Sequence, residues 1–369
     1  MHRRTLLLSV AGWPALTSAA PAAPAAPAAQ TSRQPAALRF PADFGSHPET
    51  RTEWWYVTGT LQAGEKLWGF QVTFFRAATG LDPSQPSRFS AAQLLFAHAA
   101  VTDLERGRLR HDQRIARSGF GIAQAQSGDT DITLRDWQLM RAPLPGDPRL
   151  SRYTARIASD SAGFGLDLQC DATQPVLLQG DGGVSKKGPA DADTSRYYSE
   201  PQLAAVGTLT LEGKRTEVRG RAWLDHEWSD SFIPPQAVGW DWIGMNLDDG
   251  SALTAFRLRR ADGSSVYAGG SLRAPGQAVR SFGPHEVRFT PGRVWESATT
   301  RARYPVQWTI ATPAGDFRVN ALLDNQELDS RGSIGAIYWE GVSDLLDNTG
   351  GRVGRGYLEM TGYAAALRL

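Results

Sequence analysis

Three features that many enzymes and binding proteins use are scarce in this sequence. Cysteine occurs once, as Cys170, so no intrachain disulfide and no thiolate metal cluster can form. Charge is nearly balanced, at +1 for pH 7, which leaves no basic excess for nucleic acid or an anionic surface. Helical periodicity is also missing, because no window longer than about ten residues keeps a clean 3.6-residue apolar repeat. We therefore expect little helix and no nucleic-acid partner.

Two catalytic signatures are missing as well. The pattern Gly-x-Ser-x-Gly, which marks the nucleophile elbow of α/β-hydrolases, does not occur. Metal-binding patterns such as His-Glu-x-x-His are absent too, although His47, His98 and His226 could in principle be combined with carboxylates. We predict neither a metal nor an organic cofactor.

Aromatic residues, glycine and proline are plentiful instead. The chain has 12 Trp, 38 Gly and 22 Pro, a mixture that suits short strands, tight turns and pockets walled by rings. Aromatic and β-branched runs recur along the chain, for example at residues 53–61, 67–75, 93–102, 238–247, 336–342 and 356–363. Many short strands at spacings of about ten residues predict an all-β protein of antiparallel barrels or sandwiches.

The first residues have the pattern of an export signal. Arg3 and Arg4 supply positive charge, an apolar run follows to Leu16, and small residues suitable for cleavage end at Ala20. Paired arginines before such a run fit the bacterial twin-arginine route. The apolar run is too short to cross a bilayer, so we expect no transmembrane segment. Residues 1–20 are thus predicted to be a signal peptide, and the protein periplasmic or secreted.

The remaining chain is predicted to divide into two domains. Residues 21–37 repeat Pro-Ala-Ala and should form an extended linker without packed structure. Pro234 and Pro235 cannot both lie in a central strand, so we place a domain boundary there. The predicted domains are residues 38–232 and 233–369.

The chemistry is concentrated at residues 223–228, Trp-Leu-Asp-His-Glu-Trp. In a strand, alternate side chains point to opposite faces, so Trp223, Asp225 and Glu227 share one face, opposite His226 and Trp228. An apolar wall beside a carboxyl group would raise its pKa and produce a general acid. The alternative is structural, with Asp225 and Glu227 anchoring a loop and the indoles in the core.

Other candidates have equally ordinary alternatives. Glu53 precedes Trp54, Trp55 and Tyr56, but a run of three aromatic residues is usually core. Glu53 itself could simply pair with Arg51 or Arg76. His98 lies in an apolar strand, where a hydrogen-bonded core histidine is the usual case. Trp240 and Trp242 share one strand face and could form either core or pocket wall.

Two late glutamates are expected to be structural. Glu340 and Glu359 occur in predicted strands, and half-buried glutamates in such strands usually pair with arginines. Arg352 and Arg355 are the expected partners.

Six stretches taken together resemble one family. They lie at residues 47–56, 97–103, 197–199, 223–228, 338–341 and 354–363. From about residue 38 onward the chain is similar to the AttH-like group, described as predicted secreted hydrolases and related to hydroxyneurosporene synthase, a carotenoid 1,2-hydratase. The resemblance implies two tandem lipocalin-like domains, the first ending just past the Asp-His motif. That agrees with the boundary at the Pro-Pro pair.

The resemblance also implies a role for one residue. In the hydratases, the aspartate of the Asp-His motif is the proposed acid that protonates a carbon–carbon double bond, and its position matches Asp225. Trp223 stands where the hydratases have tyrosine, and Glu227 stands where they have asparagine. A second acid changes the charge of the site, which argues against a carotenoid substrate.

The sequence therefore predicts a cofactor-independent hydratase or hydrolase that acts on a hydrophobic or amphipathic small molecule. Asp225 would be the acid, and Glu227 or His226 would activate water. The alternative for His226, on the opposite strand face, is a buried, hydrogen-bonded histidine. The predicted substrate-binding residues are Trp223, Trp228, Trp240, Trp242, Glu53, Trp55, His98 and Tyr197. The alternative is a non-catalytic periplasmic carrier of a lipid or isoprenoid. A structural partner of an inner-membrane transport system is a third possibility.

Overall fold

A computed structural model describes residues 37–82, 87 and 89–367 of the chain. Over these residues the secondary structure is 25 β-strands and one 3-10 helix, η1 (Ala42–Phe44). The predicted all-β class is confirmed. The predicted signal peptide, and all but the last residue of the predicted linker, lie outside the described residues.

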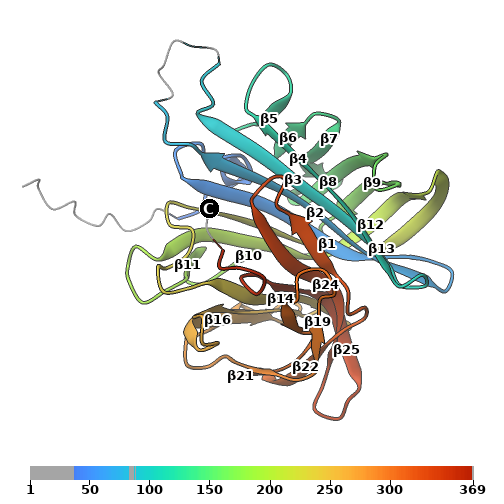
Figure 1. The fold of residues 1–369 in the computed structure, drawn as a ribbon, viewed down its shortest axis with the longest axis vertical. Helices are drawn as coiled ribbons and strands as arrows, with labels where there is room; N and C mark the ends of the chain where they lie inside the picture. Colours follow the sequence, from blue (N-terminus) through green and yellow to red (C-terminus); the bar gives the residue numbers. More distant parts are fainter. Residues whose placement is uncertain (1–36, 83–86, 88, 368–369) are drawn as a thin grey trace, which may run out of the picture. The chain divides into compact units, whose positions relative to one another are not determined.

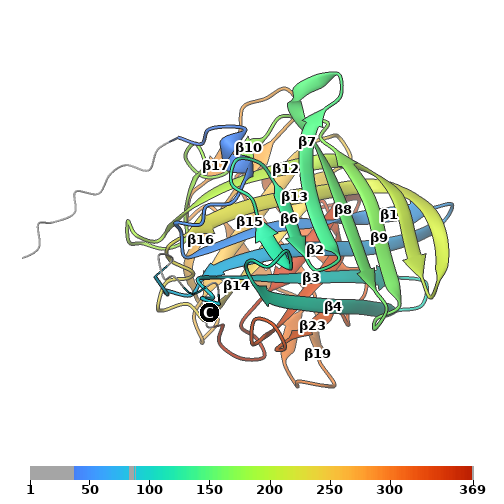
Figure 2. The same ribbon diagram turned by 90° about the horizontal axis from the view of Figure 1, so that it is seen from above.

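The first thirteen strands form one antiparallel sheet. Its strands are β1 (Thr52–Ala63), β2 (Lys66–Ala78), β3 (Gln93–Asp103), β4 (Arg108–Arg117), β5 (Ala123–Ala125), β6 (Asp131–Leu134), β7 (Trp137–Leu144), β8 (Asp147–Ser159), β9 (Phe164–Asp171), β10 (Leu177–Leu178), β11 (Val184–Lys186), β12 (Thr194–Leu211) and β13 (Lys214–Ser229). The order across the sheet is β4-β3-β2-β1-β13-β12-β9-β8-β7-β6-β5, with β10 and β11 paired to β12. Figure 2 shows this sheet curling into a nearly closed barrel, in which β4 comes back into contact with β6.

Ten of the later strands form a second sheet. They are β14 (Gly239–Leu247), β15 (Ala252–Arg259), β16 (Ser265–Arg273), β17 (Arg280–Phe282), β18 (Arg288–Pro291), β21 (Gln307–Thr312), β22 (Gly315–Ala321), β23 (Glu327–Ser330), β24 (Ala336–Leu346) and β25 (Arg352–Met360). The order is β17-β16-β15-β14-β25-β24-β22-β21-β18, with β23 paired to β24. A separate hairpin joins β19 (Val294–Glu296) to β20 (Arg303–Pro305).

Strand alternation divides the apolar residues into three layers. Along β1, Trp55 and Val57 face the interior of the first barrel, whereas Tyr56 belongs to a cluster with Trp223 and Trp242 that lies between the two sheets. A further core fills the second sheet. The central strands of both sheets are therefore buried on both faces, which explains their continuous apolar runs. Figure 1 shows β14 and β25 of the second sheet beside β13 and β1 of the first, and β24 lies against β2.

A glycine lets the two sheets approach closely. Gly69 of β2 faces the second sheet, and a Cβ atom built there would lie 2.7 Å from the Tyr357 hydroxyl and 2.9 Å from the Val342 Cβ atom. A larger residue would push the sheets apart at this point. Glycine in a strand interior marks such close approaches.

The connection between the sheets contains the two prolines singled out in the sequence. β13 ends at Ser229 and β14 begins at Gly239, with Pro234 and Pro235 between them. The division into domains at residues 38–232 and 233–369 stays a prediction. Within the described residues, no helix is long and apolar enough to cross a membrane.

Candidate functional site

A row of residues across four strands of the first sheet forms one wall of the site. Asp225 of β13 pairs with Tyr56 of β1 on one side and with Ser199 of β12 on the other. Tyr56 pairs in turn with Thr73 of β2. Directly opposite residues in an antiparallel sheet project from the same face, so these four side chains point together toward the second sheet.

A matching row on the second sheet forms the opposite wall. Glu359 of β25 pairs with Trp242 of β14 and with Glu340 of β24. Phe256 of β15 extends the row beyond Trp242. The register of the strands thus brings residues from distant parts of the chain to one place.

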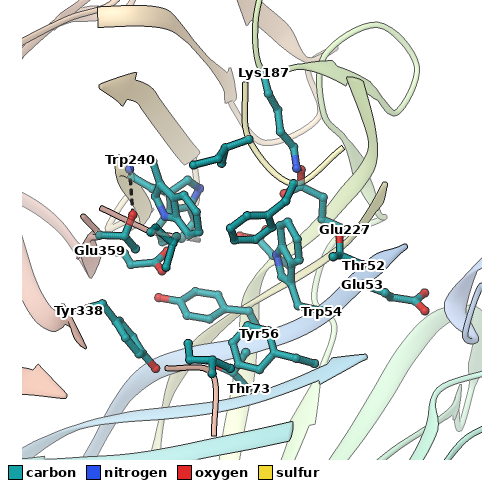
Figure 3. Close-up of a pocket in the computed structure, with 18 of the residues that line it drawn as sticks. Thr52, Glu53, Trp54, Tyr56, Thr73, Lys187, Glu227, Trp240, Tyr338 and Glu359 are labelled. Carbon is teal, nitrogen blue, oxygen red and sulfur yellow. Dashed lines mark hydrogen bonds and ion pairs between the residues drawn. The ribbon is translucent and has the colours of Figure 1, made fainter. Parts of the chain in front are cut away.

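A cavity of about 260 Å³ lies between the two walls. Its lining is mostly apolar and includes Trp54, Tyr56, Phe75, Phe96, Tyr197, Phe232, Trp240, Trp242, Phe256 and Tyr338. Figure 3 shows Tyr56, Tyr338 and Trp240 around the hollow, with Glu359 on one side and Glu227 on the other. The volume is slightly below the roughly 300–1,000 Å³ typical of pockets for drug-sized ligands, so a small molecule fits.

Asp225 lines this cavity and is almost completely buried, at 3% exposure. Its Oδ1 accepts hydrogen bonds from Ser199 Oγ at 2.5 Å and from Trp223 Nε1 at 2.8 Å. Burial raises the pKa of Asp225 to about 7, although hydrogen bonds from Ser199, Trp223 and Tyr197 oppose the rise. Near neutral pH, Asp225 is therefore able to hold a proton and to release it, as a general acid must.

Glu340 and Glu359 face the same cavity without a cation partner. No ion pair joins either of them to an arginine or lysine in the described part of the chain. Burial, and then the charge of Glu359, raise the pKa of Glu340 well above its ordinary value. Burial also raises the pKa of Glu359 to about 7, with Asp225 and Glu227 contributing and a hydrogen bond from Trp240 opposing.

The expected arginine partners of these glutamates are paired elsewhere. Arg355 binds Asp344 at 2.6 Å, and Arg352 lies 3.1 Å from Asp248. The prediction that Glu340 and Glu359 pair with these arginines was wrong. Along β25, Arg355 and Glu359 are four residues apart and share a face, but Arg355 sits beyond the cavity, next to Asp344 of β24.

Glu227 also lines the cavity, but it has a cation beside it. Lys187 Nζ lies 2.6 Å from its Oε1, and the same ammonium group lies 4.7 Å from the centre of the Trp54 ring. Glu227 is therefore tied into an ion pair on the first sheet's side of the cavity (Figure 3).

His226 lies on the other face of β13, inside the first barrel. Its Nδ1 is 3.0 Å from the Tyr198 hydroxyl and its Nε2 is 2.9 Å from Glu53 Oε1. Trp55 stacks on this imidazole with ring centroids 4.5 Å apart, and Trp228 stacks on His47 at 3.8 Å. His226, Trp55 and Trp228, predicted for the site, are thus separated from the cavity by the sheet itself.

Glu53 is the centre of a buried ion network in the same barrel. Its carboxylate binds Arg76 Nε at 2.7 Å, His47 Nδ1 at 2.7 Å and His226 Nε2 at 2.9 Å. Although Glu53 contributes to the cavity wall, Figure 3 shows its side chain directed away from the hollow. The partners keep the pKa of Glu53 far below its ordinary value despite complete burial.

The same network contains a trio that could in principle ligate a metal. Donor atoms of His47, Glu53 and His226 all lie within 4.8 Å of one another. However, Arg76 already neutralises Glu53. All four ring nitrogens of His47 and His226 also have partners: three are described above, and His47 Nε2 lies 3.3 Å from Asp43 Oδ1. A metal ion would have to displace several of these contacts, so the donor set fits a hydrogen-bonded ion network better than a metal site.

The remaining predicted residues lie at or just behind the cavity. Tyr197, Trp240 and Trp242 line it, and Trp242 Nε1 donates to the Tyr197 hydroxyl at 3.3 Å. Trp223 is buried behind the wall and reaches the site through its hydrogen bond to Asp225.

His98 contacts the site indirectly. Its Nδ1 is 2.7 Å from the hydroxyl of Tyr338, a cavity residue, and its Nε2 is 2.8 Å from Ser333 Oγ. Burial lowers the pKa of His98 to about 3, with His111 adding to the effect, so the imidazole is neutral.

Sequence reasoning missed several residues of the site. Ser199, Lys187, Glu340 and Glu359 were not singled out as functional. For the two glutamates a signal exists: both occur inside aromatic strands, and neither has a basic residue at the alternate positions closest to it. The positions of Ser199 and Lys187 depend on strand pairing and could not be inferred.

Comparison with known proteins gives a consistent assignment. The family model described as AttH-like matches residues 31–363. A crystal structure from Nitrosomonas europaea, assigned to AttH, has 45% sequence identity and a TM-score of 0.81, covering 90% of this chain and 98% of its own. The comparison with curated proteins finds no match.

More distant structures share the fold. Kievitone hydratase from Nectria haematococca has 16% identity and a TM-score of 0.67, covering 89% of this chain and 94% of its own. CghA, solved with Sch210972, has 13% identity and a TM-score of 0.51, covering 85% of this chain and 88% of its own. At these identities the similarity concerns the fold alone.

Proposed function

The chain belongs to the AttH-like family, and on that premise we propose that it is a cofactor-independent hydratase or hydrolase with Asp225 as its acid. The observation that carries the proposal is the environment of Asp225. This carboxyl group faces a mostly apolar cavity, has no cation partner among the described residues, and has its pKa raised to about 7 by burial. Such a group donates protons at neutral pH.

In the hydration reaction, the Asp225 proton passes to one carbon of a double bond and leaves a carbocation on the other. The ring faces of Tyr56, Trp240 and Trp242 stabilise that positive charge, each at roughly 0.5–2 kcal/mol. Water then adds to the cation and loses a proton, and the Asp225 carboxylate takes up a proton from solvent. In the net reaction, one water molecule is added across the double bond, and the total charge does not change.

Glu359 is the group we assign to take the proton from water. It faces Asp225 across the cavity, close enough for the charge of Asp225 to raise its pKa. Glu227, the base suggested by the sequence, is held by Lys187, and His226 is on the far side of the sheet. A pair of carboxyl groups on opposite walls is also the arrangement used for acid–base hydrolysis of glycosides.

The proposed substrate is a small hydrophobic or amphipathic molecule. The lining is dominated by aromatic side chains, and a cavity of about 260 Å³ suits a compound with few rings. The export signal predicted at residues 1–20 would place the reaction in the periplasm or outside the cell.

The experiment is an isotope assay with the purified chain in water labelled with oxygen-18. A panel of small isoprenoid alkenes and lipid-like esters is incubated with the protein, and the products are analysed by mass spectrometry. A hydratase gives an alcohol that carries the labelled oxygen, and a hydrolase gives a labelled acid.

The same assay tests the carrier function. If compounds bind in the cavity but are recovered unchanged and unlabelled across the panel, the enzymatic proposal fails. The protein is then a binding protein for the compounds it retains.

A further inference from the structure

Three buried polar atoms of the cavity lining make no hydrogen bond of good geometry within the described residues, although Tyr56 and Glu340 lie close enough to interact with each other. They are the Tyr56 hydroxyl, Gln71 Oε1 and Glu340 Oε1, and all three residues line the cavity. These residues are 6%, 2% and 3% exposed. An unpaired buried polar atom lowers stability, so a ligand that pairs all three gains affinity there.

The three atoms are positioned by the facing sheets. Gln71 and Thr73 share a face of β2, and Tyr56 pairs with Thr73 across the sheet. Gln71 Nε2 donates to Thr73 Oγ1 at 2.7 Å and to the Tyr338 hydroxyl at 3.3 Å, which fixes the direction of its free oxygen. Tyr338 and Glu340 are alternate residues of β24, so they share a face as well.

Among the described residues, most of the four carboxyl groups that face the cavity also lack a cation partner. Asp225, Glu227, Glu340 and Glu359 all line it, but only Glu227 is paired with a cation, Lys187, in the described part of the chain. Glu340 and Glu359 lie directly opposite each other on neighbouring strands. The charge of one such carboxyl group opposes ionisation of the other, and a bound cation would favour the ionised form of both.

We propose that this end of the cavity binds a primary ammonium group of the substrate. An ammonium group has three donors and no acceptor, which matches three acceptor atoms from Tyr56, Gln71 and Glu340. The aromatic faces around it favour a cation. A hydroxyl group brings only one donor for these three atoms, and a carboxylate brings no donor and a like charge.

This inference rests on the proposed function, which supplies the apolar body of the substrate and its reacting bond. The ligand is a small apolar amine, with its ammonium group at Glu340 and its reacting bond at Asp225 on the other wall. The ammonium group would also ionise Glu340, whose pKa is raised by burial and by the charge of Glu359. Binding of the amine should therefore release a proton.

Three probes with the same aromatic body test the inference: 2-phenylethylamine, 2-phenylethanol and 3-phenylpropionate. Titration calorimetry of the purified chain at pH 7 is expected to show the amine binding at least about tenfold more tightly than the alcohol, with the acid weakest. The heat of amine binding should change with the ionisation enthalpy of the buffer, because a proton is released. The heat of alcohol binding should not.

The variants Glu340→Gln and Gln71→Met should lose the preference for the amine, whereas the surface variant Glu105→Gln should keep it. Circular dichroism establishes that each variant is folded. If only one of Glu340→Gln and Gln71→Met folds, that variant is sufficient for the test. Equal binding of the amine and the alcohol by the unmodified protein would overturn the inference, as would a preference for the amine that persists in both variants. Water would then be the hydrogen-bond partner of the three atoms. Amine preference without labelled product would contradict only the proposed catalysis, because binding is measured without turnover.

Discussion

Replacing Asp225 with asparagine is expected to reduce turnover by about 10²- to 10⁴-fold, the usual contribution of a general acid. The fold and ligand binding should persist, because the asparagine Oδ1 can still accept the hydrogen bonds from Ser199 and Trp223. The measurement is the rate of labelled product formation in the oxygen-18 assay, with binding followed separately by calorimetry.

Ser199→Ala is the matched control for this experiment. It removes a hydrogen bond that lowers the pKa of Asp225 but keeps the carboxyl group, so the acid stays protonated to higher pH. In the unmodified protein, turnover should fall as pH rises through about 7, where Asp225 loses its proton, and should also fall at lower pH, where Glu359 becomes protonated. The control should remain active and move the fall caused by Asp225 to higher pH. Full turnover by Asp225→Asn would remove Asp225 from the mechanism.

Replacing Arg76 with alanine is expected to lower the free energy of unfolding by about 3–5 kcal/mol, because it removes the arginine that neutralises the buried Glu53 carboxylate. Arg76 is 2% exposed and binds Glu53 at 2.7 Å. Its other nitrogens donate to the carbonyl oxygens of His47 and Thr50 and to Gln93 Oε1. The substitution therefore removes both the counter-charge of Glu53 and the anchor of the loop before β1.

Chemical denaturation measures this effect. Arg149→Ala is the control, since Arg149 is 87% exposed and pairs only with nearby Asp147 in the described structure. That surface pair should contribute little to stability. If both variants unfolded at the same denaturant concentration, the network around Glu53 would not be the stabilising element described here.

The fold class followed from the sequence because strand patterns are local. Aromatic and β-branched runs separated by Gly and Pro identified an all-β chain, and most predicted strand segments correspond to observed strands, such as β1 and β2. The alternation at residues 223–228 also placed Asp225 and Glu227 on one face and His226 on the other, as observed. Period-two alternation depends only on neighbouring residues.

The second wall of the site could not be predicted in the same way. Pairing between strands far apart in the sequence decides which sheet Asp225 faces. It also decides that Glu359 and Glu340 lie across from Asp225. The locations of the tryptophan side chains were equally ambiguous. Trp55 and Trp242 have similar apolar surroundings in the sequence, but Trp55 lies in the barrel core and Trp242 in the cavity wall. Local pattern fixes the face of a strand but not its partner.

The central claim is that Asp225 holds a proton near neutral pH because it faces an apolar cavity. Infrared spectroscopy of the protein as a function of pH measures this directly, through the carbonyl stretch of a protonated carboxylic acid that is missing from Asp225→Asn. We predict that this band disappears with a midpoint near pH 7. A difference spectrum showing the carboxyl group already ionised at about pH 5, near the ordinary range for aspartate, would contradict the account.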